Sequence, residues 1–429
     1  MSLSVDIHHN QKYFLKLMSW VLILIIIYPF VVLQSIPKWT LLNFLLYLCS
    51  SLTWIICLQS IYHHSIKSWN IFGLFYFFSL WVNCFQLSDF QVEKTLFDFF
   101  AMFLGPLLFL LLLFSVEKIK VAPFNVKINL INLNFVYFVG VVSYCLICLH
   151  IGKTAGWRIL AIQEEHRIIS GNEFVVPYFS ALRSILSWIL VILAPYAKKR
   201  YAIIALAAIV VFSVILQVKR GDLIRILLFG GIYFIYQAKG MHNKKVKYGI
   251  LGLVALTIII FVLFGQWRIA QSGNNWQTIN QITGIKFNSA FLAWLFGYLI
   301  IQFDVFSLSS SFLFFPNYKM EELWKLVAPS YSAQEWIVPI NGFNAGTAFW
   351  GFVRDYGGFF IIEMFIFGFI INGLILLSKK TDCKGAYCFV CMLCALLVTG
   401  NYFTNRTIIA AIIFSNIIFL FTKNNKKEN

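Results

Sequence analysis

Long apolar runs follow one another along almost the whole chain and are separated by short polar segments. A helix crosses the hydrocarbon layer of a membrane with about twenty consecutive apolar residues. Runs that approach this length lie near 17–36, 40–61, 71–87, 96–116, 135–151, 177–196, 202–218, 223–237, 249–266, 358–378, 386–402 and 406–422. The pattern therefore predicts an all-α polytopic integral membrane protein, a single domain over residues 1–429 with about twelve transmembrane helices.

Two interruptions of this pattern are long, at 152–176 and at 267–357. Inside the second, the segment from Phe291 to Phe315 is apolar but is broken by Asp304 and by three consecutive serines. Its first uninterrupted piece has 13 residues, too few to cross the hydrocarbon layer. We therefore expect helices that lie in the membrane interface or fold back from it, and no additional span.

Lysines gather in one set of connecting segments, which the positive-inside rule places in the cytoplasm. These segments carry 19 of the 34 basic residues and comprise 1–16, 62–70, 117–134, 197–201, 238–248, 379–385 and 423–429. Both chain termini are then cytoplasmic. Both long interruptions lie on the opposite face of the membrane, where we expect the chemistry.

The composition supports this class, with 60% hydrophobic residues, 12% charged residues and a mean hydropathy of +0.80. A soluble domain of this length cannot bury so much apolar surface. A net charge of +17 would suggest nucleic acid for a soluble protein, but here the lysines of the loops account for it. The longest cytoplasmic loop, 117–134, has 18 residues, which excludes a cytosolic nucleotide-binding domain, and no Walker or Rossmann glycine pattern occurs. The first apolar run lacks a cleavage site, so we expect no cleavable signal peptide.

Nine cysteines fall almost wholly within the predicted spans. Cys388, Cys391 and Cys394 recur every three residues, so they could hold a metal on one helix face or pack as small residues between helices. No histidine or carboxylate stands nearby to complete a metal site, and packing is the expected role. Neither long loop contains a cysteine, so we predict no structural disulfide. We also expect no metal and no cofactor.

Arginines are distributed differently from lysines, because only Arg200 of the nine lies in a predicted cytoplasmic segment. The others lie in the outer loops or near the outer membrane boundary and are Arg158, Arg167, Arg183, Arg220, Arg225, Arg268, Arg354 and Arg406. The planar guanidinium fork binds phosphate or carboxylate bidentately, so this placement predicts a site for an anionic ligand. The alternative is that these arginines reach lipid headgroups or pair with nearby carboxylates.

A tight outer turn carries surplus positive charge. It contains Lys219, Arg220 and Asp222, and Arg225 follows one helical turn later. Three cations and one anion at a membrane boundary favour an anionic ligand.

A second motif is Asn344-x-x-Thr347 followed by Arg354-Asp355-Tyr356 and two glycines, just before the apolar run 359–378. A helix must begin near this point, and helix N-termini offer free N–H groups and a favourable dipole to anions. The alternative is a helix cap with an interfacial arginine–aspartate pair.

The first long loop places Arg158, Glu164, Glu165, His166 and Arg167 within ten residues. Helical spacing can put Glu165 or His166 beside an arginine, which suits a general base near a bound anion. The alternative is that His166 is solvated in a polar loop.

The segments 219–222 (KRGD) and 341–359 (NGFNAGTAFWGFVRDYGGF) give the chain a resemblance to the Wzy-type O-antigen polymerases, the oligosaccharide repeat-unit polymerases of the bacterial inner membrane. The second segment is similar to the family's Asn-x-x-Thr followed by an Asp-Phe-Gly-like motif, with Tyr356 in place of the phenylalanine. By topology, the resemblance covers nearly the whole chain. It implies a GT-C-like architecture with two long periplasmic loops.

The resemblance implies a glycosyltransferase that moves a growing glycan from polyprenyl pyrophosphate to a hydroxyl of an incoming lipid-linked repeat unit, on the periplasmic face. Arginines would bind the pyrophosphate and stabilise its developing charge without a metal. The expected partners are this lipid-linked oligosaccharide, membrane lipid and a protein that regulates chain length. The alternatives are an O-antigen ligase, which transfers the glycan to a lipid core, and a lipid-linked oligosaccharide flippase or other transporter.

The same resemblance assigns an expected role to each candidate residue. The candidates for the general base are Asp355, His166 and Glu165. The pyrophosphate would be bound by Arg220, Arg268, Arg354, Arg158, Lys219, Arg225 and Arg406. The glycan would contact Asn344, Thr347, Tyr356, Trp267 and Trp336.

Overall fold

The structure is a computed structural model. It describes residues 40–63, 66–85, 88–89, 91–124, 131–165, 174–239, 299–313 and 347–423, with isolated residues elsewhere between 248 and 323. Within these ranges, the side chains of 162–165, 220, 309–313 and 423 lie outside the description. The described residues are almost entirely helical, as the apolar pattern predicts.

The elements up to residue 237 are α2 (Leu41–His63), α3 (Ser68–Asn83), α4 (Leu96–Phe99), η1 (Phe100–Leu104), α5 (Gly105–Glu117), β1 (Ile131–Asn132), α6 (Leu133–Ala155), α7 (Arg158–Glu165), α8 (Phe179–Leu193), η3 (Ala194–Tyr196), α9 (Lys199–Ile209), η4 (Val210–Ile215) and α10 (Arg220–Gln237). They are followed by α14 (Ile301–Leu313), α16 (Ala348–Tyr356), η5 (Gly357–Phe359), α17 (Phe360–Thr381), α18 (Lys384–Ala395), η6 (Leu396–Val398), η7 (Tyr402–Thr404), α19 (Arg406–Phe421) and β2 (Thr422–Lys423). The segments η1 and η4 are π-helical.

Five of the described helical segments are long and apolar enough to cross a membrane. They are Leu41–His63, Leu96–Glu117, Leu133–Ala161, Phe179–Tyr196 and Ala348–Thr381. The all-α, multi-pass character predicted from the sequence is therefore confirmed. The predicted runs 17–36 and 249–266 lie wholly or largely outside the described residues, and each of the other predicted runs overlaps a described helix.

Helix α18 lies at the centre of the bundle. All of its residues from Gly385 to Ala395 are buried, and it packs against α3, α8, α10, α17 and α19. Cys388, Cys391 and Cys394 are fully buried in this contact, as the packing interpretation predicts. Among the described residues, no group of three histidine, cysteine or acidic side chains is placed to hold a metal.

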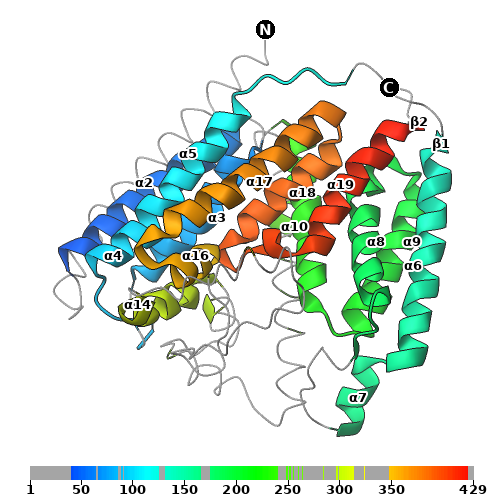
Figure 1. The fold of residues 1–429 in the computed structure, drawn as a ribbon, viewed down its shortest axis with the longest axis horizontal. Helices are drawn as coiled ribbons and strands as arrows, with labels where there is room; N and C mark the ends of the chain where they lie inside the picture. The colour runs from blue at the N-terminus through cyan, green and yellow to red at the C-terminus, as the bar shows by residue number, and fades with distance from the viewer. Residues whose placement is uncertain are drawn as a thin grey trace.

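Segments predicted to be cytoplasmic meet at one end of the bundle. Glu117 pairs with Lys379 at 2.7 Å and accepts hydrogen bonds from the hydroxyls of Ser68 and Tyr387. At the same end β1 pairs in parallel with β2. Helices α7, α14 and α16 lie at the opposite end (Figure 1). The described parts of the lysine-bearing segments near Glu117 and β1 are therefore at the opposite end of the fold from α7, α14 and α16.

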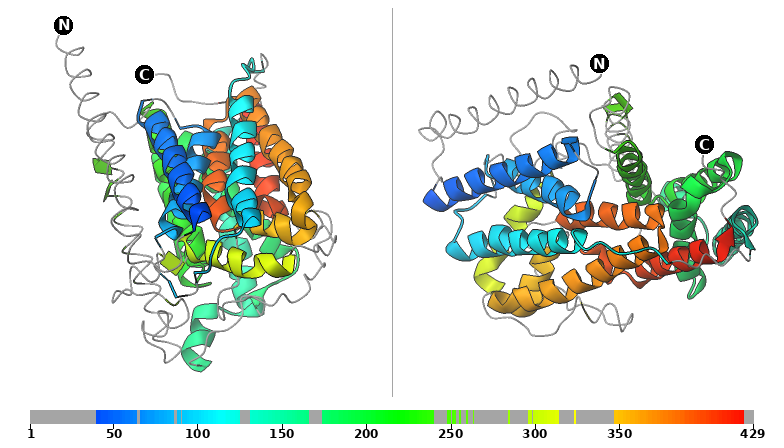
Figure 2. Two further views of the ribbon diagram at one scale, coloured as in Figure 1. Left: turned by 90° about the vertical axis from the view of Figure 1, so that its left-hand side faces the viewer. Right: turned by 90° about the horizontal axis from the view of Figure 1, so that it is seen from above.

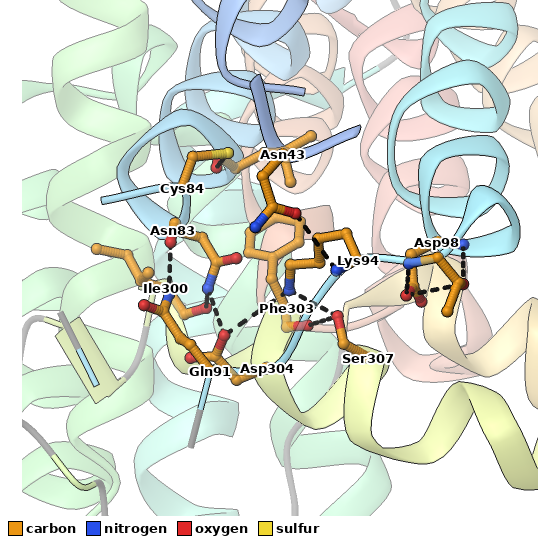
Figure 3. Close-up of polar contacts among 12 residues, drawn as sticks. Asn43, Asn83, Cys84, Gln91, Lys94, Asp98, Ile300, Phe303, Asp304 and Ser307 are labelled. Carbon is orange, nitrogen blue, oxygen red and sulfur yellow. Dashed lines mark hydrogen bonds and ion pairs between the residues drawn. The ribbon is translucent and has the colours of Figure 1, made fainter. Parts of the chain in front are cut away.

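Helix α14 lies across the bundle instead of along it (Figure 2) and contacts α3, α4 and α16. Of the predicted interfacial segment 291–315, the structure describes mainly this helix, so the expectation that the whole segment adds no span stays a prediction. Its Asp304 is fully buried, lies 3.9 Å from the Lys94 ammonium and accepts a hydrogen bond of 2.7 Å from Asn83 (Figure 3). Lys94 also donates to Ser307 at 2.6 Å. The same aspartate that interrupts the apolar pattern thus fixes α14 on the bundle.

We predict that Asp304→Ala lowers the free energy of unfolding by about 3–5 kcal/mol, because Lys94 is left as a buried charge without its carboxylate. The double variant Lys94→Met/Asp304→Leu should recover most of this loss, since an apolar pair carries no desolvation penalty. Thermal unfolding of the detergent-solubilised protein measures both effects, with exposed Glu93→Ala as the control. A double variant as unstable as Asp304→Ala would contradict the ion-pair account.

Candidate functional site

A cavity of about 420 Å³ lies at the end of the bundle that holds α7. It is bounded by the start of α7, the first turns of α8 and α10, the turn between η4 and α10, and the start of α19. Its cationic lining residues are Arg158, Arg183, Lys219 and Arg225. Hydroxyl and amide groups are contributed by Ser180, Ser184, Ser187, Ser213, Gln217 and Asn405.

The charge of this lining is strongly unbalanced. Four cations face one carboxylate, Asp222, so the described lining carries a formal charge of +3. Arg183 is only 7% exposed, and a charge that is shielded from water interacts more strongly with a ligand than one at an open surface. The arrangement favours an anion with several acceptor oxygens.

Helical spacing explains how α8 contributes to the cavity. Ser180, Arg183, Ser184 and Ser187 are separated by three or four residues, so they lie on one face of the helix. All four line the cavity. The opposite face carries exposed apolar side chains, including Phe179 and Leu182. One helix therefore presents a polar wall to the cavity and an apolar surface away from it.

The turn between η4 and α10 is strained. Val218 has a φ of 52°, a left-handed conformation that a β-branched residue rarely adopts. The turn is tied to α7 by a 3.1 Å hydrogen bond from the Ile159 N–H to the Leu216 carbonyl. It places both Gln217 and Lys219 against the cavity. Such strain is typical of functional sites, where the surrounding structure holds it.

The side-chain amide of Gln217, which lines this cavity, has an N–H group that is not used in a hydrogen bond to another described residue. Its side chain is 2% exposed, and its Nε2 has no hydrogen-bond partner among the described residues. A buried amide left unpaired costs about 1–3 kcal/mol. A bound ligand that offers an acceptor oxygen would remove this cost.

Arg225 is held from several sides. Its Nη1 donates to Asp222 Oδ1 at 2.9 Å. The guanidinium carbon lies 4.6 Å from the centre of the Tyr402 ring and 5.8 Å from that of Trp188. These contacts fix the plane of the guanidinium group, which reduces the entropy lost when it binds an anion.

The pKa of the Lys219 ammonium group is changed by its surroundings. Burial lowers the pKa of its ammonium group from the ordinary 10.5 to about 8, and the positive charge of Arg183 acts in the same direction. The carboxylate of Asp222 opposes this shift. A bound anion would favour the protonated form of Lys219 and would therefore take up a proton at alkaline pH.

The structure brings three of the predicted pyrophosphate residues together, since Arg158, Lys219 and Arg225 all line the cavity. Arg220 is the first residue of α10, next to Lys219, although its side chain is not described. Arg406 begins α19 beside the lining residue Asn405 and is exposed. For six predicted site residues, the structure describes either nothing or the backbone alone. These residues are Arg268, His166, Glu165, Trp267, Trp336 and Asn344.

The pair Arg354–Asp355 lies elsewhere in the fold. It belongs to the last turn of α16, which η5 separates from α17, whereas the sequence predicts a helix start. Its side chains are buried and paired at 3.1 Å, and neither lines the cavity. Thr347 caps α16 by accepting the Trp350 N–H at 3.1 Å, and Tyr356 is buried. These contacts match the alternative interpretation, a helix cap with an arginine–aspartate pair.

Some of the lining residues are not among the predicted site residues. The sequence places Arg183 near the outer membrane boundary but does not assign it to the pyrophosphate. The signal was present, because Ser180, Arg183, Ser184 and Ser187 form one polar stripe in an otherwise apolar run. Gln217 and Asn405 carry no comparable pattern in the sequence.

Comparison of the chain with protein-family models, with curated proteins and with solved structures finds no match. The function of the protein is therefore inferred from the cavity residues and their geometry.

We predict that the affinity of the cavity for a soluble pyrophosphate diester falls as the pH rises through about 8. Lys219 loses its proton above that pH in the free protein, whereas the ligand's charge is constant in this range. Linkage of one proton limits the loss to about tenfold between pH 7 and pH 9. Titration calorimetry measures it.

Lys219→Met should bind more weakly and lose this pH dependence. Lys199→Met is the matched control, because Lys199 is exposed and does not line the cavity, and its neighbour Lys198 bonds to Asn134 beside β1. The same pH dependence in Lys219→Met as in the wild type would contradict the assignment.

Proposed function

We propose that the protein is a glycosyltransferase of the bacterial inner membrane, a repeat-unit polymerase that uses a polyprenyl-pyrophosphate-linked oligosaccharide as donor. The observation that carries the proposal is the cavity, with its four cations to one carboxylate. A pyrophosphate diester carries two negative charges on adjacent groups. Fork-shaped arginines bind such groups bidentately.

The topology supports a donor delivered on the outer face. The positive-inside rule, applied to the lysine-bearing turns beside Glu117, assigns that end of the bundle to the cytoplasm. Helix α7, whose first residue Arg158 lines the cavity, lies at the other end (Figure 1), which is then periplasmic. About twelve spans and cytoplasmic termini complete a GT-C-like arrangement. An enzyme facing the periplasm has no nucleotide sugar available and needs a lipid-linked donor.

The reaction follows from this placement. A hydroxyl of the incoming repeat unit attacks the anomeric carbon of the growing glycan, and a new glycosidic bond forms. The bond from that carbon to the pyrophosphate oxygen breaks, and the lipid pyrophosphate leaves with the electron pair. Arg158, Arg183, Lys219 and Arg225 stabilise the charge that develops on the leaving group. The proton of the attacking hydroxyl passes to a base.

Two rival functions use the same lipid carrier. A flippase or transporter usually has ionisable groups near the middle of the membrane. Here the cations gather at one end of the bundle, which favours transfer over transport. An O-antigen ligase would need the same pyrophosphate site, and only the resemblance of the segments 219–222 and 341–359 favours the polymerase.

Deletion of the gene separates these functions by the surface polysaccharide that remains. We expect single repeat units attached to the lipid core, because export and ligation continue without polymerisation. Bare core with polymer still on the lipid carrier would indicate a ligase. Single units trapped on the cytoplasmic side would indicate a flippase. Gel electrophoresis of the extracted glycolipids reads out all three patterns.

We predict that Arg183→Gln fails to restore long chains in the deletion strain. Loss of one charged hydrogen-bond donor should weaken binding of geranylgeranyl pyrophosphate about 10–100-fold. Thermal stability should stay equal or rise, because one of four like charges is removed. Arg200→Gln, exposed at the opposite end, is the control. Normal chain length together with unchanged binding would exclude Arg183 from the site.

A further inference from the structure

Asp222 is the only carboxylate among the described residues that line the cavity. Of the other described carboxylates, Asp304 faces Lys94 and Asp355 faces Arg354, and neither lines the cavity. Glu117 lies at the opposite end, in its cluster with Lys379. The transfer reaction needs a proton acceptor beside the bound donor, and Asp222 is placed there.

We propose that Asp222 is the catalytic base, the group that accepts the proton of the attacking hydroxyl. This inference rests on the proposed function. As the hydroxyl oxygen bonds to the anomeric carbon, its proton passes to the carboxylate. The bond between that carbon and the pyrophosphate breaks, and the electron pair leaves with the lipid pyrophosphate.

The geometry supports this role. Asp222 lies in the first turn of α10, and its side chain is 21% exposed. Its Oδ1 accepts from Arg225 Nη1 at 2.9 Å, and its Oδ2 makes no hydrogen bond to another described residue. One oxygen is therefore held while the other can face a substrate hydroxyl. A base must reach the proton it abstracts within hydrogen-bond distance.

Arg225 can serve both substrates at once. A guanidinium group has five N–H donors in a rigid plane, and one of them is used on Asp222. The rest can contact phosphate oxygens of the donor while the stacking on Tyr402 keeps the plane fixed. Arg225 thus connects the base to the leaving-group site, and a shift of either would disturb both.

The test compares Asp222→Asn with the wild type in proteoliposomes. Binding is measured with geranylgeranyl pyrophosphate, and transfer is measured with lipid-linked repeat units extracted from the deletion strain. We expect unchanged binding but a transfer rate about 10²–10⁴-fold lower. Asp382→Asn is the matched control, because Asp382 is exposed at the opposite end and its left-handed φ of 57° suits asparagine.

Other results would overturn the proposal. If Asp222→Asn weakens binding as much as transfer, Asp222 only positions Arg225. Transfer within about fivefold of the wild-type rate would show that another group is the base, while the proposed function stands. A wild-type protein that neither binds the probe nor transfers glycan would instead refute the proposed function itself. Asp222→Ala adds a second measurement, because external formate should restore part of its transfer rate if a carboxylate base is missing.

Discussion

Repulsion among like charges is the constraint around which the cavity is built. Two cations about 7 Å apart at an effective dielectric constant of about 20 repel by about 2 kcal/mol, and four such groups line one small space. The fold must oppose this repulsion with contacts made elsewhere. The lowered pKa of Lys219 is one consequence, and the strained backbone at Val218 is held in the same turn. A bound dianion would convert the repulsion into attraction without moving the protein groups, which is how a preorganised site stabilises developing charge.

Elsewhere in the described structure, three buried cations each face a carboxylate. Lys94 faces Asp304, Arg354 faces Asp355, and Lys379 faces Glu117. Each of these pairs joins elements of the bundle or closes a helix end, and none lines the cavity. The attraction within a balanced pair offsets at least part of the free energy needed to remove both charges from water. Such a pair needs no ligand. The cavity differs from these three pairs because its four cations share one carboxylate, which is typical of a binding site and not of a structural ion pair.

The sequence predicts the helices well and the site in part. Hydropathy locates the apolar helices because each span must be apolar over nearly its whole length. Lysine content separates the two sets of turns, and the residues from Lys219 to Arg225 are correctly grouped because they are neighbours on one helix start. The role of Arg183 is harder to predict, because an arginine inside an apolar run can equally well bind a lipid headgroup. The sequence predicts a helix start near the Arg354–Asp355 pair, whereas the pair lies in the last turn of α16. The reason is that composition alone does not distinguish the nine-residue α16 from the span that follows.

Long-range packing completes the cavity and could not be read from local sequence. Arg225 and Asp222 are neighbours on α10, but the ring of Tyr402 that stacks on Arg225 comes from a distant part of the chain. Helix α19 packs on α8, and a hydrogen bond of 3.0 Å joins the hydroxyls of Ser184 and Thr407. This contact also brings Asn405 to the cavity wall. The contacts that orient Arg225 are thus complete only when η7 docks beside α10, so the anion site is a property of the completed bundle and not of the motif at 219–222 alone.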